Sequence, residues 1–78
     1  MRLISQTRDI DVPYESSAIA RADGLIVAYS VNYDSNKIVM GMYSTEEKAK
    51  KVMERLHNIY AEFTIANIVF RFPKDDEV

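Results

Sequence analysis

The pattern of apolar and polar residues changes its period once along the chain, at Ser44. Before that point, apolar and polar residues alternate in short runs, which is typical of half-buried β-strands. After it, apolar residues recur three or four positions apart from Ala49 to Phe63, which is typical of an amphipathic helix. The sequence therefore predicts a strand-rich first part, residues 1–43, followed by one helix.

Two turn signals, Asp23-Gly24 and 34–36, flank the most regular alternation, at 25–33. Asp-Gly between apolar runs favours a two-residue hairpin, because glycine accepts a positive φ without steric cost. Pro13 cannot donate to a β-ladder, so the segment around it is an edge strand or a shaped loop. The other expected strands are 2–6, 9–14, 17–22 and 37–43.

The helix is expected to begin at a capping box made by Ser44 and Glu47. In such a box the side chain of each residue accepts a hydrogen bond from the backbone amide of the other. We place the helix from Thr45 to about Phe63. Its apolar stripe is wide enough to pack on a sheet, so the helix is expected to be part of the scaffold.

The chain is expected to end with a strand at about 67–72, which Pro73 stops, and an acidic, solvated tail at 74–78. Residues 1–73 then form a single α+β domain, in which a mainly antiparallel sheet of four to five strands packs against one helix. A single helix covers one face of a sheet, so the other face is either solvated or used for contact.

Three tyrosines, Tyr29, Tyr33 and Tyr43, share one parity along the predicted strands and are candidates for that contact face. Three interpretations remain open: ordinary cross-strand packing, a protein-binding face, or a platform that stacks unpaired bases. The net charge of −2 and the few basic residues near the sheet argue against nucleic acid. The acidic residues of the tail are a second candidate, since they can pair with a basic partner surface: Asp75, Asp76 and Glu77.

Few residues offer chemistry. There is no cysteine, and the only histidine, His57, has no oriented acid–base partner at helical spacing. Asp9 and Asp11 share one side of a strand, which suits either a hard cation or the protection of a sheet edge by charge. Two glycines are too few for a phosphate-binding loop, and no serine lies in a nucleophile motif. We therefore expect no enzymatic activity, no metal and no cofactor.

Length and composition fit one small domain: 78 residues, 47% of them hydrophobic and 28% charged with both signs mixed. No apolar run approaches the roughly 18 residues that a membrane helix needs, and no signal peptide is evident, so a cytoplasmic protein is expected. Exposed strand edges also permit a homodimer.

Four segments, taken from the two ends of the chain and the predicted helix, resemble small proteins encoded by phages and prophages of Firmicutes. They are 1–6, 11–15, 43–49 and 69–77, with Met53, Leu56 and Tyr60 following the third segment and no comparable match in 16–42. One departure is the lack of a glycine after Gln6-Thr7, which leaves the geometry of the first hairpin open.

The resemblance implies a phage-encoded protein that acts in the cytoplasm of a bacterial host. The function it favours is binding and inhibition of a host defence complex, with an anti-CRISPR protein that blocks a CRISPR effector as the sharpest version. The alternatives are a phage accessory, assembly or regulatory module without an anti-defence role, and a single-strand nucleic-acid binder that uses the sheet tyrosines.

Overall fold

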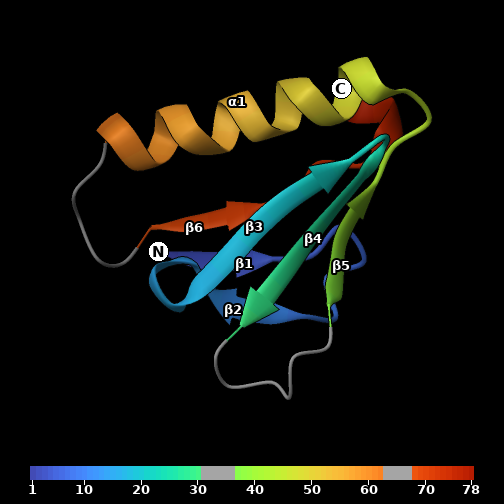
Figure 1. Ribbon diagram of the computed structural model, residues 1–78. Coiled ribbons are helices and arrows are strands. Elements are labelled where there is room, and N and C mark those ends of the chain that lie inside the picture. Colours follow the sequence, from blue (N-terminus) through green and yellow to red (C-terminus); the bar gives the residue numbers. More distant parts are fainter. Residues whose placement is uncertain (31–36, 63–67) are drawn as a thin grey trace.

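The computed structural model describes residues 1–30, 37–62 and 68–78. Within these ranges it contains six strands, one α-helix and two short 3₁₀ helices, so the predicted α+β class is confirmed (Figure 1). The strands are β1 Arg2–Ile4, β2 Asp11–Pro13, β3 Ser17–Ala22, β4 Leu25–Ser30, β5 Ile38–Met42 and β6 Val69–Arg71. The helices are α1 Glu46–Glu62, η1 Tyr14–Ser16 and η2 Asp75–Glu77.

The six strands form two three-stranded sheets, where the sequence predicted one sheet of four to five strands. The terminal sheet has the order β2-β1-β6, and the hairpin sheet has the order β3-β4-β5. In the terminal sheet β1 is central, antiparallel to β2 and parallel to β6, with Leu3 opposite both Val12 and Phe70. Strand β2 with Pro13 is at the edge, as its missing amide hydrogen requires.

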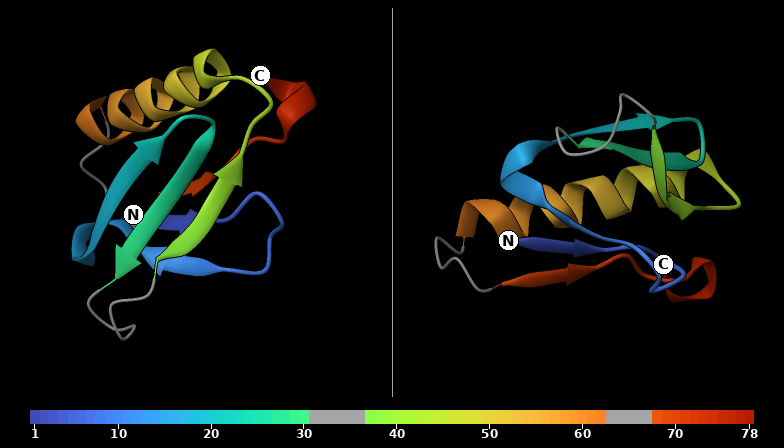
Figure 2. Two further views of the ribbon diagram at one scale, coloured as in Figure 1. Left: turned by 45° about the vertical axis from the view of Figure 1, so that its right-hand side comes forward. Right: turned by 90° about the horizontal axis from the view of Figure 1, so that it is seen from below.

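Seen from below, helix α1 lies between the hairpin sheet and the terminal sheet (Figure 2, right). All three units contribute to one core, so the helix and both sheets depend on each other for stability. Each fully buried large apolar side chain contributes roughly 1.5–3 kcal/mol relative to exposure. The core includes Ala49, Val52 and Leu56 of α1, Leu3, Val12 and Phe70 of the terminal sheet, and Ile26, Ala28 and Met40 of the hairpin sheet.

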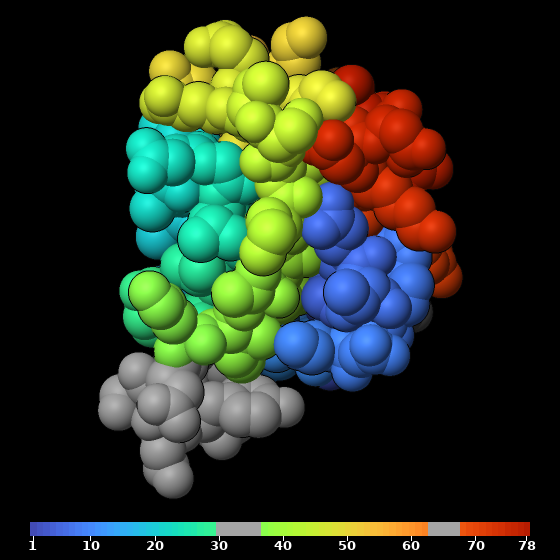
Figure 3. All heavy atoms as spheres, turned by 90° about the vertical axis from the view of Figure 1, so that its right-hand side faces the viewer, coloured from blue at the N-terminus to red at the C-terminus, as the bar shows by residue number. Residues whose placement is uncertain are grey.

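The two sheets are also joined at β5, through Gln6. The Gln6 amide donates to the carbonyl of Met40 at 2.7 Å. The Gln6 side chain accepts from the Met42 amide at 3.0 Å and donates to the Met42 carbonyl at 3.1 Å. The N-terminal segment therefore lies directly beside the outer edge of β5 (Figure 3).

The helix cap is one residue later than predicted. Thr45 Oγ1 accepts the Lys48 amide at 3.2 Å, so Thr45 is the N-cap residue. The Ser44 amide donates instead to Asp75 Oδ1 at 2.7 Å. The predicted capping box between Ser44 and Glu47 is therefore wrong, because a carboxylate distant in sequence takes the amide that Glu47 was expected to bind.

The C-terminal segment is anchored to the rest of the molecule through Asp75 and Val78, while Lys74, Asp76 and Glu77 are exposed. Residues Asp75–Glu77 form η2, and Lys48 Nζ donates to the Asp75 carbonyl at 2.9 Å. Val78 is partly buried against the core. These contacts hold the last residues against the start of α1 (Figure 1).

The glycine of the β3–β4 hairpin has a different role from the one predicted. The positive φ in the turn belongs to Asp23, at 53°, and not to Gly24. A Cβ at position 24 would collide with the carbonyl oxygen of Tyr43, whose amide donates to the Gly24 carbonyl at 2.9 Å. Gly24 is needed for this close approach of two backbones.

The first hairpin, whose geometry the sequence left open, turns without a glycine. Arg8 takes a positive φ of 69°, and its amide donates to the Ser5 carbonyl at 2.9 Å. Ser5 is buried and accepts the Ile10 amide on its hydroxyl at 3.1 Å, which closes the loop.

Candidate interaction face

The outer face of the hairpin sheet, which points away from α1 and the core, carries only apolar side chains over the described part of its strands. No described element covers this face, as Figure 1 shows from the front. The register of the sheet aligns these side chains in three rows across the strands. They are Ala18, Ala20 and Ala22 of β3, Leu25, Val27 and Tyr29 of β4, and Val39 and Met42 of β5.

Several of these side chains are well exposed for their type. Tyr29 is 42% exposed, Val39 43% and Met42 63%. The three alanines are also exposed, whereas Val27 at the centre is buried. Scattered exposed apolar residues are normal on a protein surface, but a contiguous patch without any charged group indicates a binding surface.

A β-bulge in β5 decides which residues belong to the face. Ile26 lies opposite Gly41 and Val27 opposite Val39, so Met40 is an extra residue between them. A bulge of this kind reverses the inward and outward parity of the residues that follow it. Met42 therefore points outward, whereas strict alternation along 37–43 would place it on the same side as the buried Met40.

The same bulge turns Tyr43 into the core. The prediction that Tyr43 is a contact residue on the same face as Tyr29 and Tyr33 is therefore corrected. Tyr43 is only 6% exposed, and its hydroxyl donates to the Pro73 carbonyl at 2.7 Å. Its ring lies against Gly41, where a Cβ would be 2.7 Å from Tyr43 Cε2. Burial raises the pKa of Tyr43 to about 12, since the interior disfavours the phenolate.

The other predicted site residues do not gather around Tyr29. Tyr33 lies outside the described residues. The three acidic residues of η2 lie near the start of β4, whereas Tyr29 is close to its end (Figure 1). Asp75 is engaged within the molecule, and the hydrogen bond from the Ser44 amide lowers the pKa of its carboxyl. The predicted interaction residues therefore lie in two separate regions, one around Tyr29 and one at η2. Only the region around Tyr29 forms an extended face.

Sequence reasoning missed the alanine row of β3 and the exposed position of Met42. The alternation of Ala18, Ala20 and Ala22 with Ile19 and Arg21 was a usable signal, since it marks one uniformly small, apolar side of a strand. The sequence contains no comparable signal that predicts the bulge in β5.

The outer face of the terminal sheet is built differently, although it is formed by the same kind of strands. It carries Arg2, Asp11 and Arg71 among Ile4, Pro13 and Val69. Arg2 Nε donates to Asp11 Oδ1 at 2.8 Å. Charge on an outer face is the usual way to keep a sheet solvated. The contrast indicates that the uncharged face of the hairpin sheet has a role other than solvation.

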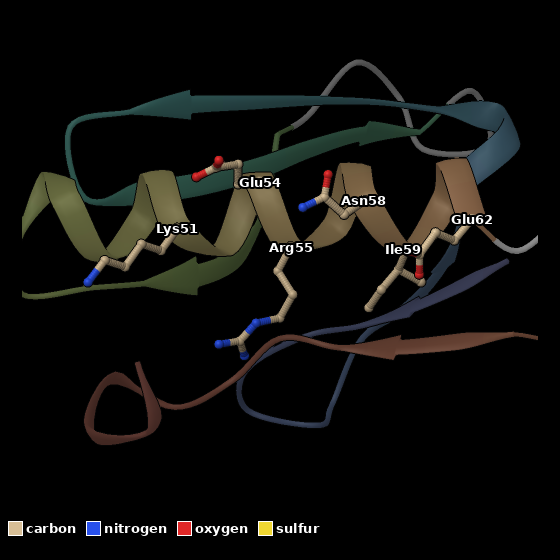
Figure 4. A pocket seen from close by; sticks show the side chains of 6 residues that line it. All are labelled: Lys51, Glu54, Arg55, Asn58, Ile59 and Glu62. Carbon is tan, nitrogen blue, oxygen red and sulfur yellow. The ribbon is translucent and has the colours of Figure 1, made fainter.

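The helix also carries a shallow hollow of about 440 Å³. Figure 4 shows that all the side chains lining it come from α1, and that Glu54 and Asn58 point toward β3. The lining mixes both charges with one apolar residue: Lys51, Glu54, Arg55, Asn58, Ile59 and Glu62. Because one helix forms the whole lining, the hollow has no opposing wall to enclose a ligand.

The described residues contain no grouping suited to metal binding, that is, no cluster of three or more His, Asp or Glu side chains. Asp11 is paired with Arg2, which fits the edge-protection interpretation of Asp9 and Asp11. His57 is exposed on α1.

Comparison with known proteins finds no family model, no curated protein and no solved structure that matches this chain. Within the described ranges, α1 is not long and apolar enough to cross a membrane.

Proposed function

We propose that the protein is a non-catalytic binding module that docks a partner protein on the outer face of its hairpin sheet. The observation that carries this proposal is the run of eight apolar side chains on an uncovered sheet face, next to a second sheet whose outer face is charged. Desolvating such a face costs little, because no charge has to be stripped of water. Tyr29 is the natural anchor, since tyrosine is enriched among the residues that dominate interface energies.

The partner class follows from the phage resemblance and is part of the proposal. A phage-encoded inhibitor of a host defence complex, in its sharpest form an anti-CRISPR protein, needs a stable scaffold and one contact face. It would work in the cytoplasm of the bacterial host. An apolar face supports contact by shape, whereas imitation of DNA phosphates would need a dense acidic surface.

The alternative as a single-strand nucleic-acid binder loses support from the same face. Base-stacking platforms combine aromatic side chains with a cationic groove for the backbone. The strand residues of the described outer face include one exposed aromatic residue, Tyr29, and no Lys or Arg, and the exposed Lys37 before β5 is a single cation. An accessory or assembly module of a phage would use the face in the same way, with a different partner.

Two matched valines allow a direct test of the face. Val39 on the hairpin sheet and Val69 on the terminal sheet are strand residues with nearly equal exposure, 43% and 41%. We expect wild type and Val69→Lys to capture the same defence protein from a panel of purified CRISPR effectors and other host defence complexes. Val39→Lys should lose it, because a lysine ammonium would be buried without a partner.

Equal capture by Val39→Lys would show that the face is not the contact. If the wild-type protein captures no member of the panel, the proposed inhibition of a host defence complex is contradicted. Gene deletion then separates the accessory role, because an accessory module lowers phage titre even in a host without defence systems.

A further inference from the structure

The four edges of the two sheets differ in how they are protected against pairing with another strand. An unprotected edge presents unpaired amides and carbonyls, and proteins block such edges with short strands, proline, charge or bulges. Strands β2 and β6 are three residues long; β2 contains Pro13 and Asp11, and β6 ends two residues before Pro73. Both edges of the terminal sheet are therefore protected.

The β5 edge of the hairpin sheet is protected in two ways. The bulge at Met40 interrupts its regular ladder. Gln6 then occupies the outer edge, with its own amide on the Met40 carbonyl and its side chain on both the amide and the carbonyl of Met42. The side chain thus imitates a neighbouring strand.

Of these devices the β3 edge has only one charge, Arg21, which is paired with Glu46 at 3.3 Å. The strand is six residues long, pairs with β4 without irregularity and contains no proline. Ala22 and Leu25 flank a two-residue turn and so exchange both hydrogen bonds, and the antiparallel alternation then directs Ala20 and Ala18 to β4. The amides and carbonyls of Ile19 and Arg21 consequently point outward. Within the described ranges, no group forms a hydrogen bond to them.

We infer that the edge of β3 accepts an extended segment of the partner protein as a fourth, antiparallel strand of the hairpin sheet. This inference rests on the proposed function and names the form of the partner. Strand spacing and rise give the outer face dimensions of about 14 by 20 Å. The area of this face alone is well below the roughly 800 Å² per partner that a stable interface buries. Main-chain pairing at the edge supplies the missing contact.

The surroundings of the edge specify the side chains of such a segment. On the outer side, the exposed methyl groups of Ala18, Ala20 and Ala22 leave room for large apolar side chains beside them. On the inner side, Glu54 and Asn58 point from α1 toward β3 (Figure 4). Among the described residues Glu54 has no cation within 4.0 Å. The segment should alternate large apolar residues with lysine or arginine.

A synthetic peptide in which Ile, Val and Tyr alternate with Lys serves as the probe, with the same peptide N-methylated at alternate amides as its control. Binding is followed by NMR, through chemical shifts and hydrogen exchange of the backbone amides. We expect the probe to slow exchange at Ile19 and Arg21, and the N-methylated peptide to bind at least tenfold more weakly.

Two substitutions at one position isolate the edge. Arg21→Pro removes an outward amide hydrogen and leaves the pairing with β4 in place. It should therefore weaken binding of the probe peptide at least tenfold. Arg21→Ala removes the same ion pair with Glu46 but keeps the amide, and should bind like wild type. Both variants are first checked for a folded spectrum. Equal binding of the two would overturn the inference.

The remaining outcomes separate the edge from the face. If the probe changes chemical shifts only at Tyr29, Val39 and Met42, it binds the outer face, and the inference that it pairs with the β3 edge is overturned. Absence of binding at millimolar probe would overturn the edge and leave the capture experiment with Val39→Lys unaffected. Protection of Ile19 and Arg21 that grows with protein concentration, without probe, would assign the edge to a second copy of this chain and overturn the partner named here.

Discussion

The hydroxyl of Tyr43 donates a 2.7 Å hydrogen bond to the carbonyl oxygen of Pro73, thirty positions later in the chain. The bond joins the connection between β5 and α1 to the segment that follows β6. Because the ring is buried against Gly41, the bond is shielded from water. It helps to hold the C-terminal segment in place, together with the contact between Ser44 and Asp75.

Replacing Tyr43 with Phe should destabilise the protein at neutral pH by about 0.5–1.5 kcal/mol, because the Pro73 carbonyl loses one of its two donors and keeps the Gln6 side chain. The pKa of Tyr43 in the folded protein is about 12, against an ordinary value of 10.0. An unfolded chain releases this proton near its ordinary pKa, whereas the folded protein keeps it. The stability linked to Tyr43 is therefore complete below the ordinary pKa and is lost as the pH rises toward the folded value, by up to about 1.4 kcal/mol per pH unit.

Urea unfolding of wild type and Tyr43→Phe at neutral pH and at several alkaline pH values measures this effect. The advantage of wild type should shrink as the pH rises above the ordinary tyrosine pKa. A difference between the two proteins that stays constant with pH would contradict the buried, hydrogen-bonded state of Tyr43.

Replacing Asp75 with Ala should lower the melting temperature at neutral pH, because the Ser44 amide loses its acceptor and Lys48 loses its ion-pair partner. The hydrogen bond from Ser44 lowers the pKa of Asp75 below its ordinary value of 3.8. The stability it provides is present above that ordinary value and is lost as the pH falls through the folded pKa. Thermal unfolding should therefore show the two proteins converging in acid.

Asp76→Ala is the matched control for that experiment. Asp76 is the neighbouring exposed carboxylate, and within the described part of the chain no ion pair includes it. Its removal should leave the melting temperature nearly unchanged. A loss equal to that of Asp75→Ala would mean that the acidity of η2 matters and the specific bond to Ser44 does not.

Replacing Gly24 with Ala should destabilise the protein by about 1–3 kcal/mol, because the added methyl group forces the hairpin away from the Tyr43 carbonyl. Gly24→Asn discriminates between the two roles of this glycine. Asparagine tolerates a positive φ better than most residues, so it would be accepted if φ were the constraint. We expect Asn to be at least as damaging as Ala in chemical denaturation, and a well-tolerated Asn would contradict the close approach.

The sequence predicted the elements well because their signals are local. The change of period at Ser44 and the alternation of 25–33 come from residues that are neighbours in the chain. Pairing of the strands is a different matter. The parallel contact of β1 with β6 joins the two ends of the described chain, and no local pattern encodes it.

The candidate face was predictable only in part, for a physical reason that Met40 illustrates. Parity along a strand identifies a face only while the ladder is regular, and one bulged residue exchanges the faces of everything after it. Tyr29, which lies before the bulge in the pairing, keeps its predicted exposure, whereas Tyr43 does not. The helix cap shifted for a similar reason, since Asp75 reaches Ser44 from a distant part of the sequence.

The last prediction concerns Gln6, which closes the β5 edge. Gln6→Ala should cost about 0.5–1.5 kcal/mol, because the exposed amide and carbonyl of Met42 exchange the Gln6 side chain for water. The Gln6 side chain also donates to the Pro73 carbonyl at 3.2 Å, so this contact is lost too. Gln6→Glu is the informative comparison, since a carboxylate still accepts the Met42 amide but has no hydrogen to donate to the two carbonyls.

Hydrogen exchange at the Met42 amide distinguishes these variants at one site. Exchange should be fast in Gln6→Ala and remain slow in Gln6→Glu, while denaturation shows both to be less stable than wild type. An open β5 edge should also make Gln6→Ala more prone to associate at high protein concentration, which sedimentation measures. If the Met42 amide stays protected in Gln6→Ala, then the backbone bond from Gln6 to Met40 is sufficient to close the edge, and the side chain does not protect it.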